Sequence, residues 1–207
     1  MLLHGITTAW VFLKSADGKN LLTREQGLSD NGLLELGRDV LGVASAEIKG
    51  LDGSKLETIS GNNTPQYSYA DPLKPTMALT VNSFKMATYA KLVGMKKQGT
   101  GWQMADIKPV GGCVIKSPHM TDDGFTYFCF PSGNFLGSTD KKLDSDTDSK
   151  KTPVTDSLNF AAINDPNING LYRIYDTTDT DFTTEDAMFK EVLPDYAKTP
   201  TTDSHTA

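Results

Sequence analysis

The strongest constraint on the fold is a series of short segments in which apolar and polar residues alternate, separated by turns rich in Gly, Pro, Asn and Asp. This alternation has the period of a strand that buries one face, and the turn spacing is typical of antiparallel sheets. The segments predicted as strands are residues 6–13, 43–48, 55–60, 66–70, 77–81, 110–116, 124–130, 153–163 and 171–175. We therefore expect a mainly β protein, an antiparallel β-sandwich or small barrel flanked by one helix, with a long loop and terminal arms.

One hairpin is predicted in the stretch LGVASAEIKGLDGSKLETISGNNTP, residues 41–65. Strands 43–48 and 55–60 flank Asp52-Gly53, a pair that tolerates the positive φ of a tight hairpin turn. We expect one face of this hairpin to pack on the core and the other to carry polar and charged side chains.

A second hairpin is predicted from strands 110–116 and 124–130, with its turn near Thr121. Residues equidistant from the turn become cross-strand neighbours, so Cys113 and Cys129 lie opposite one another or one position apart. A disulfide between them is conceivable, but two semi-buried free thiols in a reducing compartment are the favoured interpretation.

The helical period appears in two places. From Phe84 onward, polar residues recur three positions apart. Asn82 or Ser83 is suited to cap the start of a helix here, and Gly94 its end. The pattern predicts a helix of about ten residues that packs against the sheet. A second short helix is expected over 185–192, opened by Thr183 or Thr184.

The domain organisation follows from the polar stretches. We expect a single domain over residues 1–196, with extended connections at 14–40 and 136–152, and a flexible C-terminal tail at 197–207. Long polar connections of this kind suit segments that become ordered on neighbouring subunits.

The charge balance and hydropathy exclude some partners. With 26 acidic and 20 basic residues the chain carries a formal charge of −6, which disfavours nucleic-acid binding because such binding depends on Lys and Arg neutralising phosphates. No apolar run approaches the roughly eighteen residues needed to span a bilayer, so no membrane contact is expected. The apolar run near the start is read as a strand and not a secretion signal, because no Lys or Arg precedes it and Thr7 and Thr8 interrupt it.

Catalytic patterns are weak. The three histidines, His4, His119 and His205, have no partner at metal-ligand or nucleophile spacing. Ser117 and His119, with Asp122 or Asp123, have the residue types of a catalytic triad, but neighbours in one turn rarely reach triad geometry. We expect no enzymatic activity.

Metal-binding patterns are equally weak. Asp144, Asp146 and Asp148 match the opening of a calcium loop, yet Ser149 and Thr155 stand where that loop needs Gly and Glu. The acidic group at 176, 179 and 181 has no better pattern. We expect no metal and no cofactor.

Several segments, taken in order, resemble one protein family. They are Leu41-Gly42, Ile48-x-Gly50, Lys55-x-Glu57 and Gly61-Asn62-Asn63, a strand with Tyr67 and Tyr69, MALTVNSFKMATYAKLVG, GFTYFCFPSGNF, KKTPVTDSLNFAAI and EDAMFKEVLPDY. They resemble the major tail proteins, the tail tube subunits of long-tailed (siphovirus-type) bacteriophages of Gram-positive hosts, and the resemblance covers about residues 6–196. The acidic loop 136–151 and the Thr-rich tail after Pro200 depart from the family texture.

The resemblance implies a structural virion protein without enzymatic activity. Such a subunit forms stacked, hexameric rings that make the tail tube, through which phage DNA passes without specific binding. The implied partners are copies of itself and the tape-measure, tail terminator and distal tail proteins. The implied location is the virion tail, after assembly in the host cytoplasm.

Inter-subunit contacts are expected where a free strand edge can be continued by a neighbour in a closed ring. The candidate residues are Ala46, Glu47, Lys49, Asp52, Lys55 and Glu57 in the hairpin region, and Lys141, Asp144 and Asp146 in the polar loop. Six copies at −6 each would carry a formal −36 per ring, and we expect an acidic bore that keeps DNA from adhering.

Two other functions fit the same pattern of strands. A β-sandwich recognition module, such as a carbohydrate-binding or adhesin domain, would show exposed aromatic rings on one face and often a calcium site. The two tryptophans, Trp10 and Trp102, lie in different segments. A phage head-decoration or head-tail completion protein would share the β texture without repeated stacking.

Overall fold

The structure is a computed structural model that describes residues 2–53, 56–138, 141, 143, 145 and 153–197. Its strands are β1 (Thr8–Lys14), β2 (Leu33–Glu35), β3 (Val43–Lys49), β4 (Leu56–Gly61), β5 (Thr64–Ala70), β6 (Thr76–Val81), β7 (Met95–Gln98), β8 (Gly101–Met104), β9 (Val110–Pro118), β10 (Phe125–Gly137), β11 (Asp156–Ala162) and β12 (Arg173–Asp176). The helices are α1 (Met86–Val93), α2 (Glu185–Val192) and the 3-10 turn η1 (Arg38–Val40). The protein is mainly β, as the sequence predicts.

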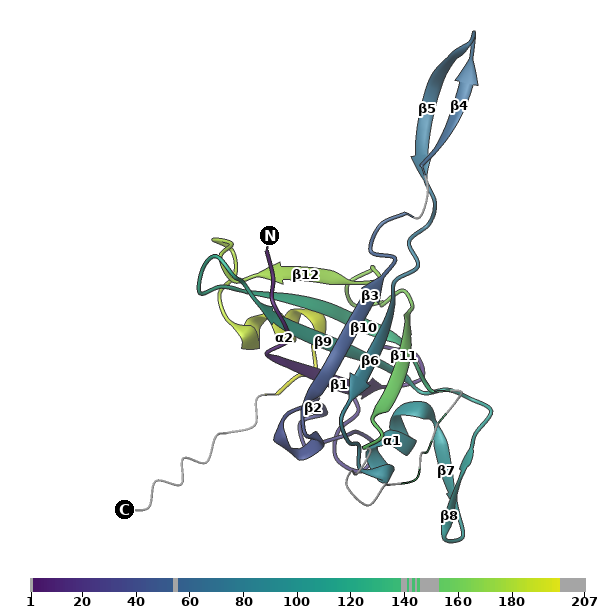
Figure 1. The fold of residues 1–207 in the computed structure, drawn as a ribbon, viewed down its shortest axis with the longest axis vertical. Helices are drawn as coiled ribbons and strands as arrows, with labels where there is room; N and C mark the ends of the chain where they lie inside the picture. The colour runs from purple at the N-terminus through teal and green to yellow at the C-terminus, as the bar shows by residue number, and fades with distance from the viewer. Residues whose placement is uncertain are drawn as a thin grey trace.

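Eight strands form one antiparallel sheet in the order β2-β1-β9-β10-β11-β6-β3, with β12 also paired to β10. The long strand β10 carries the sheet from one layer to another: its first part pairs with β12 and its last part with β11. Its register with β9 shifts between Phe130 and Gly133, and a side chain at Gly133 would lie 2.3 Å from the Phe160 ring. Strands β3, β6 and β11 therefore cross β9 and β12 steeply (Figure 1). The end strands β2 and β3 do not pair, so the result is a sandwich and no closed barrel.

The main core fills the space between the two layers. On β1, Ala9, Val11 and Leu13 point into it, and on β6 the alternate residues Met77, Leu79 and Val81 do the same. The other large buried side chains of this core are Leu36, Leu92, Ile115, Phe130, Phe135, Leu158 and Phe160. Helix α1 closes one end of it through Leu92 and Val93, and ends at Gly94, whose φ of 76° suits glycine.

A second core lies on the opposite face of β1, β9 and β10. Trp10 and Phe12 alternate with the residues of the main core, so β1 is buried on both faces. Helix α2 covers this face with Met188, Phe189 and Val192. The helix begins at Thr184, whose hydroxyl accepts a hydrogen bond from the Ala187 amide at 3.1 Å. The protein therefore has three layers: the two layers of the bent eight-stranded sheet, and α2.

The hairpin predicted over residues 43–60 is wrong. Strand β3 pairs with β6, and β4 pairs instead with β5 through the two-residue turn Asn62-Asn63, in which both φ values are positive (51° and 64°). A two-residue turn of this kind matches the twist of a hairpin. The β4–β5 hairpin projects far from the sandwich and does not pack on its core (Figure 1).

Other differences are smaller. The connection 14–40 contains β2 and η1, and a second projecting hairpin, β7–β8, lies in a stretch for which no strand is predicted. Lys85, not Asn82 or Ser83, occupies the N-cap position of α1, whereas the second predicted helix, 185–192, is α2 and begins after Thr184 as expected. The strand pattern continues to Gly137, so the start of the predicted loop 136–152 belongs to β10.

Candidate assembly surfaces

The β4–β5 hairpin is the most exposed regular structure among the described residues. Every residue of β5 is exposed, and each one of β4 is exposed or half-buried. Tyr67 and Tyr69 stack with ring centroids 6.2 Å apart, and the cross-strand register places Ile59 and Glu57 beside them on one face. A two-stranded hairpin is marginally stable alone in water, so this apolar face suits contact with another molecule.

Strand β3 forms a free edge of the large sheet. It pairs with β6 on one side, and no other described strand pairs with it. Ala46 is half-buried towards the main core, whereas Glu47 and Lys49 are exposed and form an ion pair at 2.9 Å. An unpaired edge of seven residues offers backbone donors and acceptors to a neighbouring strand.

One face of the layer β3-β6-β11-β10 carries neither a helix nor a second sheet among the described residues, and we call it the open face. It consists of the residues that alternate with the main core: Ser45, Glu47, Lys49, Thr76, Ala78, Thr80, Asn134, Leu136, Ser157, Asn159 and Ala161. Cross-strand pairs join them in rows, such as Lys49, Thr76, Ala161 and Asn134. A shallow groove of about 450 Å³ runs over these rows. Its lining combines small side chains, such as Thr76 and Ala78, with the apolar side chains of Met77, Phe135, Leu136 and Phe160.

The sequence-predicted contact residues are only partly brought together. Three of them, Ala46, Glu47 and Lys49, lie on β3. Asp52 lies just before the hairpin that carries Glu57. Its carboxylate accepts a hydrogen bond from the Gly53 amide at 2.7 Å. Lys141 is elsewhere, in an ion pair with Asp156 at 2.7 Å. Lys55, Asp144 and Asp146 lie outside the described residues. Tyr67 and Tyr69 were predicted as strand residues but not as contacts; their alternation on an unburied strand was the available signal.

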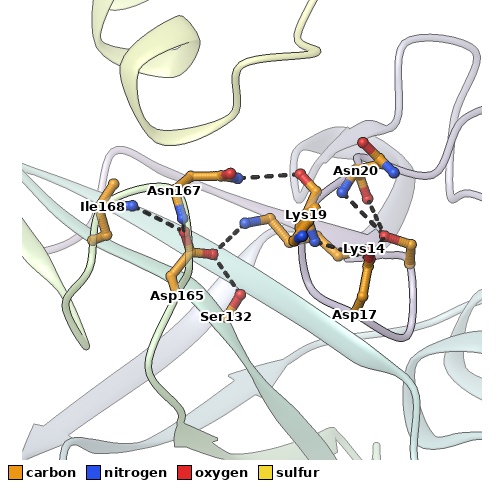
Figure 2. A network of polar contacts seen from close by, with 9 residues as sticks. Lys14, Asp17, Lys19, Asn20, Ser132, Asp165, Asn167 and Ile168 are labelled. Atoms are coloured by element: carbon orange, nitrogen blue, oxygen red, sulfur yellow. Dashed lines mark hydrogen bonds and ion pairs between the residues drawn. The ribbon is translucent and has the colours of Figure 1, made fainter.

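A buried polar network fixes the bend of the sheet (Figure 2). Lys14, at the end of β1, forms an ion pair with Asp165, and both side chains are fully buried. The Asp165 carboxylate also accepts hydrogen bonds from the Ser132 hydroxyl at 2.5 Å and from the amides of Asn167 and Ile168 at 2.8 and 3.3 Å. Because Ser132 lies at the irregularity of β10, the network joins both layers at the place where the sheet turns.

The residues of the possible triad do not form one. The Ser117 hydroxyl donates to the Gly5 carbonyl at 2.8 Å, while the His119 ring contacts Asp122 through Nδ1 at 2.7 Å and the hydroxyl of fully buried Thr126 through Nε2 at 2.9 Å. The Gly124 amide, with His119, holds the pKa of Asp122 below its usual range. This cluster ties the β9–β10 turn in place and presents no accessible hydroxyl at the ring.

The two cysteines lie on neighbouring strands, offset by one residue in register, so they are not cross-strand partners. Cys113 pairs with Phe130, and Cys129 with Val114, so their side chains point to opposite faces and enter different cores. Burial raises the pKa of both thiols. We predict that folded protein reacts negligibly with Ellman's reagent at pH 8 and that the denatured protein releases two thiols per chain. One thiol or none after denaturation without reductant would contradict this geometry.

The described residues contain neither a metal-binding cluster nor a membrane-spanning helix. Among residues 2–53, 56–138, 141, 143, 145 and 153–197, no group of three or more His, Cys, Asp or Glu could hold a metal ion. The aspartates at 144, 146 and 148 fall outside these ranges, and Asp176 is engaged with Thr178, whose hydroxyl and amide lower the pKa of its carboxyl. No helix in the described part of the chain has the length and apolar character to cross a membrane.

Comparison with known proteins identifies a family. A family model described as phage tail tube protein matches residues 1–201, which is nearly the whole chain. No curated protein matches.

Proposed function

This chain belongs to the phage tail tube protein family, and we propose that its copies form stacked rings, six to a ring, that enclose the conduit for DNA. A tail tube protein is a structural component of the virion tail and assembles with itself and with other tail components. We further propose that residues 1–196 act as one unit, that assembly takes place in the host cytoplasm, and that tape-measure, tail terminator and distal tail proteins set where the tube starts and stops.

One observation supports the proposal beyond the family match: two parts of the sheet structure lack a packing or pairing partner within the described chain. They are the projecting β4–β5 hairpin and the free edge of β3. The hairpin exposes Tyr67 and Tyr69 at 62% and 46%, and β3 offers an unpaired backbone edge. A second copy can complete both, since heterologous contacts between identical subunits generate rings or filaments. A recognition module is less well supported, because Trp10 is buried and Trp102 lies on the separate β7–β8 hairpin.

Negative-stain electron microscopy of concentrated protein at neutral pH tests this proposal, with the elution volume at low concentration measured beside it. We expect hollow tubes or stacked rings. If the protein stays monomeric both alone and after addition of preformed tail tips, which supply any missing initiator, the proposal is wrong.

The edge of β3 gives a specific prediction. Substitution Glu47→Lys removes the ion pair with Lys49 and places two like charges on the edge, and Ala46→Pro removes a backbone donor from it. We expect either change to block polymerisation while the monomer still folds, as seen in its circular dichroism spectrum and elution volume. Normal tubes from Ala46→Pro would show that the β3 edge is not an inter-subunit element.

A further inference from the structure

We infer that Lys14 and Asp165 become joined by an intramolecular isopeptide bond, an amide between the Lys14 Nζ and the Asp165 Cγ. The buried ion pair between the two side chains is the reactant of this step. The residues are 151 positions apart, so the bond closes most of the domain into one covalent loop. The inference goes beyond the proposed function and does not depend on ring assembly.

The fold keeps water away from both reacting groups. The side chains of Lys14 and Asp165 are fully buried. The loop after β1 packs against them: a Cβ at Gly18 would lie 3.6 Å from the Ser132 hydroxyl, and the Asn167 side chain donates to a carbonyl of the same loop at 3.1 Å. Two buried charges carry a large desolvation cost, which a neutral amide avoids. Burial therefore favours the amide over the ion pair.

The hydrogen bonds of Asp165 suit attack on its carboxyl carbon (Figure 2). Its Oδ1 accepts from the backbone amides of Asn167 and Ile168 at 2.8 and 3.3 Å. Two amides directed at one oxygen stabilise the negative charge that develops there when a nucleophile adds to the carbon. The other oxygen, Oδ2, contacts the Lys14 ammonium and accepts from the Ser132 hydroxyl at 2.5 Å. One oxygen is therefore placed to hold charge and the other to leave.

The reaction needs no other reactant. The Lys14 ammonium first passes one proton to Oδ2, which leaves a neutral amine beside a neutral carboxylic acid. The nitrogen lone pair then attacks Cγ, a C–N bond forms, and the carbonyl electron pair moves to Oδ1, where the two amides hold it. The Ser132 hydroxyl relays a second proton from the nitrogen to Oδ2, and the Cγ–Oδ2 bond breaks. One ammonium and one carboxylate become one amide and one water, and the fixed positions of the two groups supply a high effective concentration.

The residue after Asp165 removes a competing reaction. An aspartate carboxyl can also be attacked by the backbone nitrogen of the next residue, which gives a cyclic imide. That residue is Pro166, which has no backbone N–H, so this imide cannot form. The amine that contacts the carboxyl is Lys14.

The intact mass of the reduced and denatured natural protein tests the inference. We expect it to be one water molecule lighter than its sequence, on purification or after prolonged incubation of the folded protein at neutral pH. Trypsin should then fail to cleave after Lys14 and should release residues 1–19 joined to residues 152–173. Lys14→Arg is the matched control. It keeps a positive charge opposite Asp165, but a guanidinium stays protonated and is no nucleophile, so this variant should keep its full mass.

Mass is the readout because the loss of an ion pair and the loss of an amide both lower stability. Natural protein that keeps its full mass after incubation overturns the inference. So does a water loss that maps to another peptide, such as the one with Asp52-Gly53, where a cyclic imide can form.

The role of Ser132 has its own test. Ser132→Ala should leave a larger fraction of chains at full mass at a given time after synthesis, with an unchanged circular dichroism spectrum. An equal fraction at full mass would refute the relay by this hydroxyl.

Discussion

Replacing Lys14 with Met is expected to lower the free energy of unfolding by about 3–5 kcal/mol, because it leaves the Asp165 carboxylate buried without its counter-ion. For a chain of this size each kcal/mol corresponds to about 2–4 °C in the melting temperature, so the loss is roughly 6–20 °C. Urea unfolding followed by circular dichroism measures it. The matched control is Lys19→Met, an exposed lysine nearby, which should change stability by about 0.5 kcal/mol or less.

A double variant separates the charge from the hydrogen bonds. Lys14→Met combined with Asp165→Asn removes both buried charges but keeps a side-chain oxygen for the amides of Asn167 and Ile168. We expect it to be more stable than Lys14→Met alone. If the two are equally unstable, the loss comes from packing of the lysine chain and not from an uncompensated carboxylate.

The second large effect is expected at the hairpin: Tyr67→Ala with Tyr69→Ala should abolish polymerisation and leave the monomer as stable as before. Buried interface tyrosines often contribute about 2 kcal/mol or more each, so the pair corresponds to roughly a thousandfold weaker association. The monomer should be unaffected because neither ring belongs to either core. Sedimentation of tubes against protein concentration, beside a thermal melt of dilute protein, measures both effects.

A matched control is available on the other projecting hairpin. Gln98→Ala and Gln103→Ala change exposed residues of β7–β8 and should leave polymerisation as it is. If the double tyrosine variant forms tubes at the same critical protein concentration as the natural protein, the aromatic face of β4–β5 does not contact a neighbouring subunit.

Much of the fold could be predicted from local patterns, because most strands bury one face and alternate accordingly. Strand partners were harder. Asp52-Gly53 and Asn62-Asn63 are both suitable for a tight turn, and the local sequence does not decide between them. Strand β3 pairs with β6 instead, because Met77 and Leu79 of β6 align with Ile48 and Ala46 of β3 and help to bury them. This pairing joins segments that are distant in the sequence.

Contacts between segments that are distant in the sequence could not be predicted from local patterns. Lys14 and Asp165 are 151 positions apart, and neither has a neighbour that suggests a buried ion pair. The turn position predicts the cysteines to within one residue of each other, but a difference of one residue moves a side chain to the other face of the sheet. The open face appears in the sequence only as the residues that alternate with core residues on four strands, and the sequence pattern does not show that α2 covers the other layer instead.

The projecting hairpin also has a directional consequence. It extends from one end of the molecule, beyond the strands β3 and β6 that lead into it, and the opposite end has the different hairpin β7–β8 (Figure 1). If the hairpin contacts the next subunit, as we propose, the polymer is polar: one terminus presents β4–β5 hairpins without a neighbour, and the other presents the surface that such a hairpin would contact. In such a polymer the two termini offer different surfaces, so different proteins would be needed to start and to halt growth.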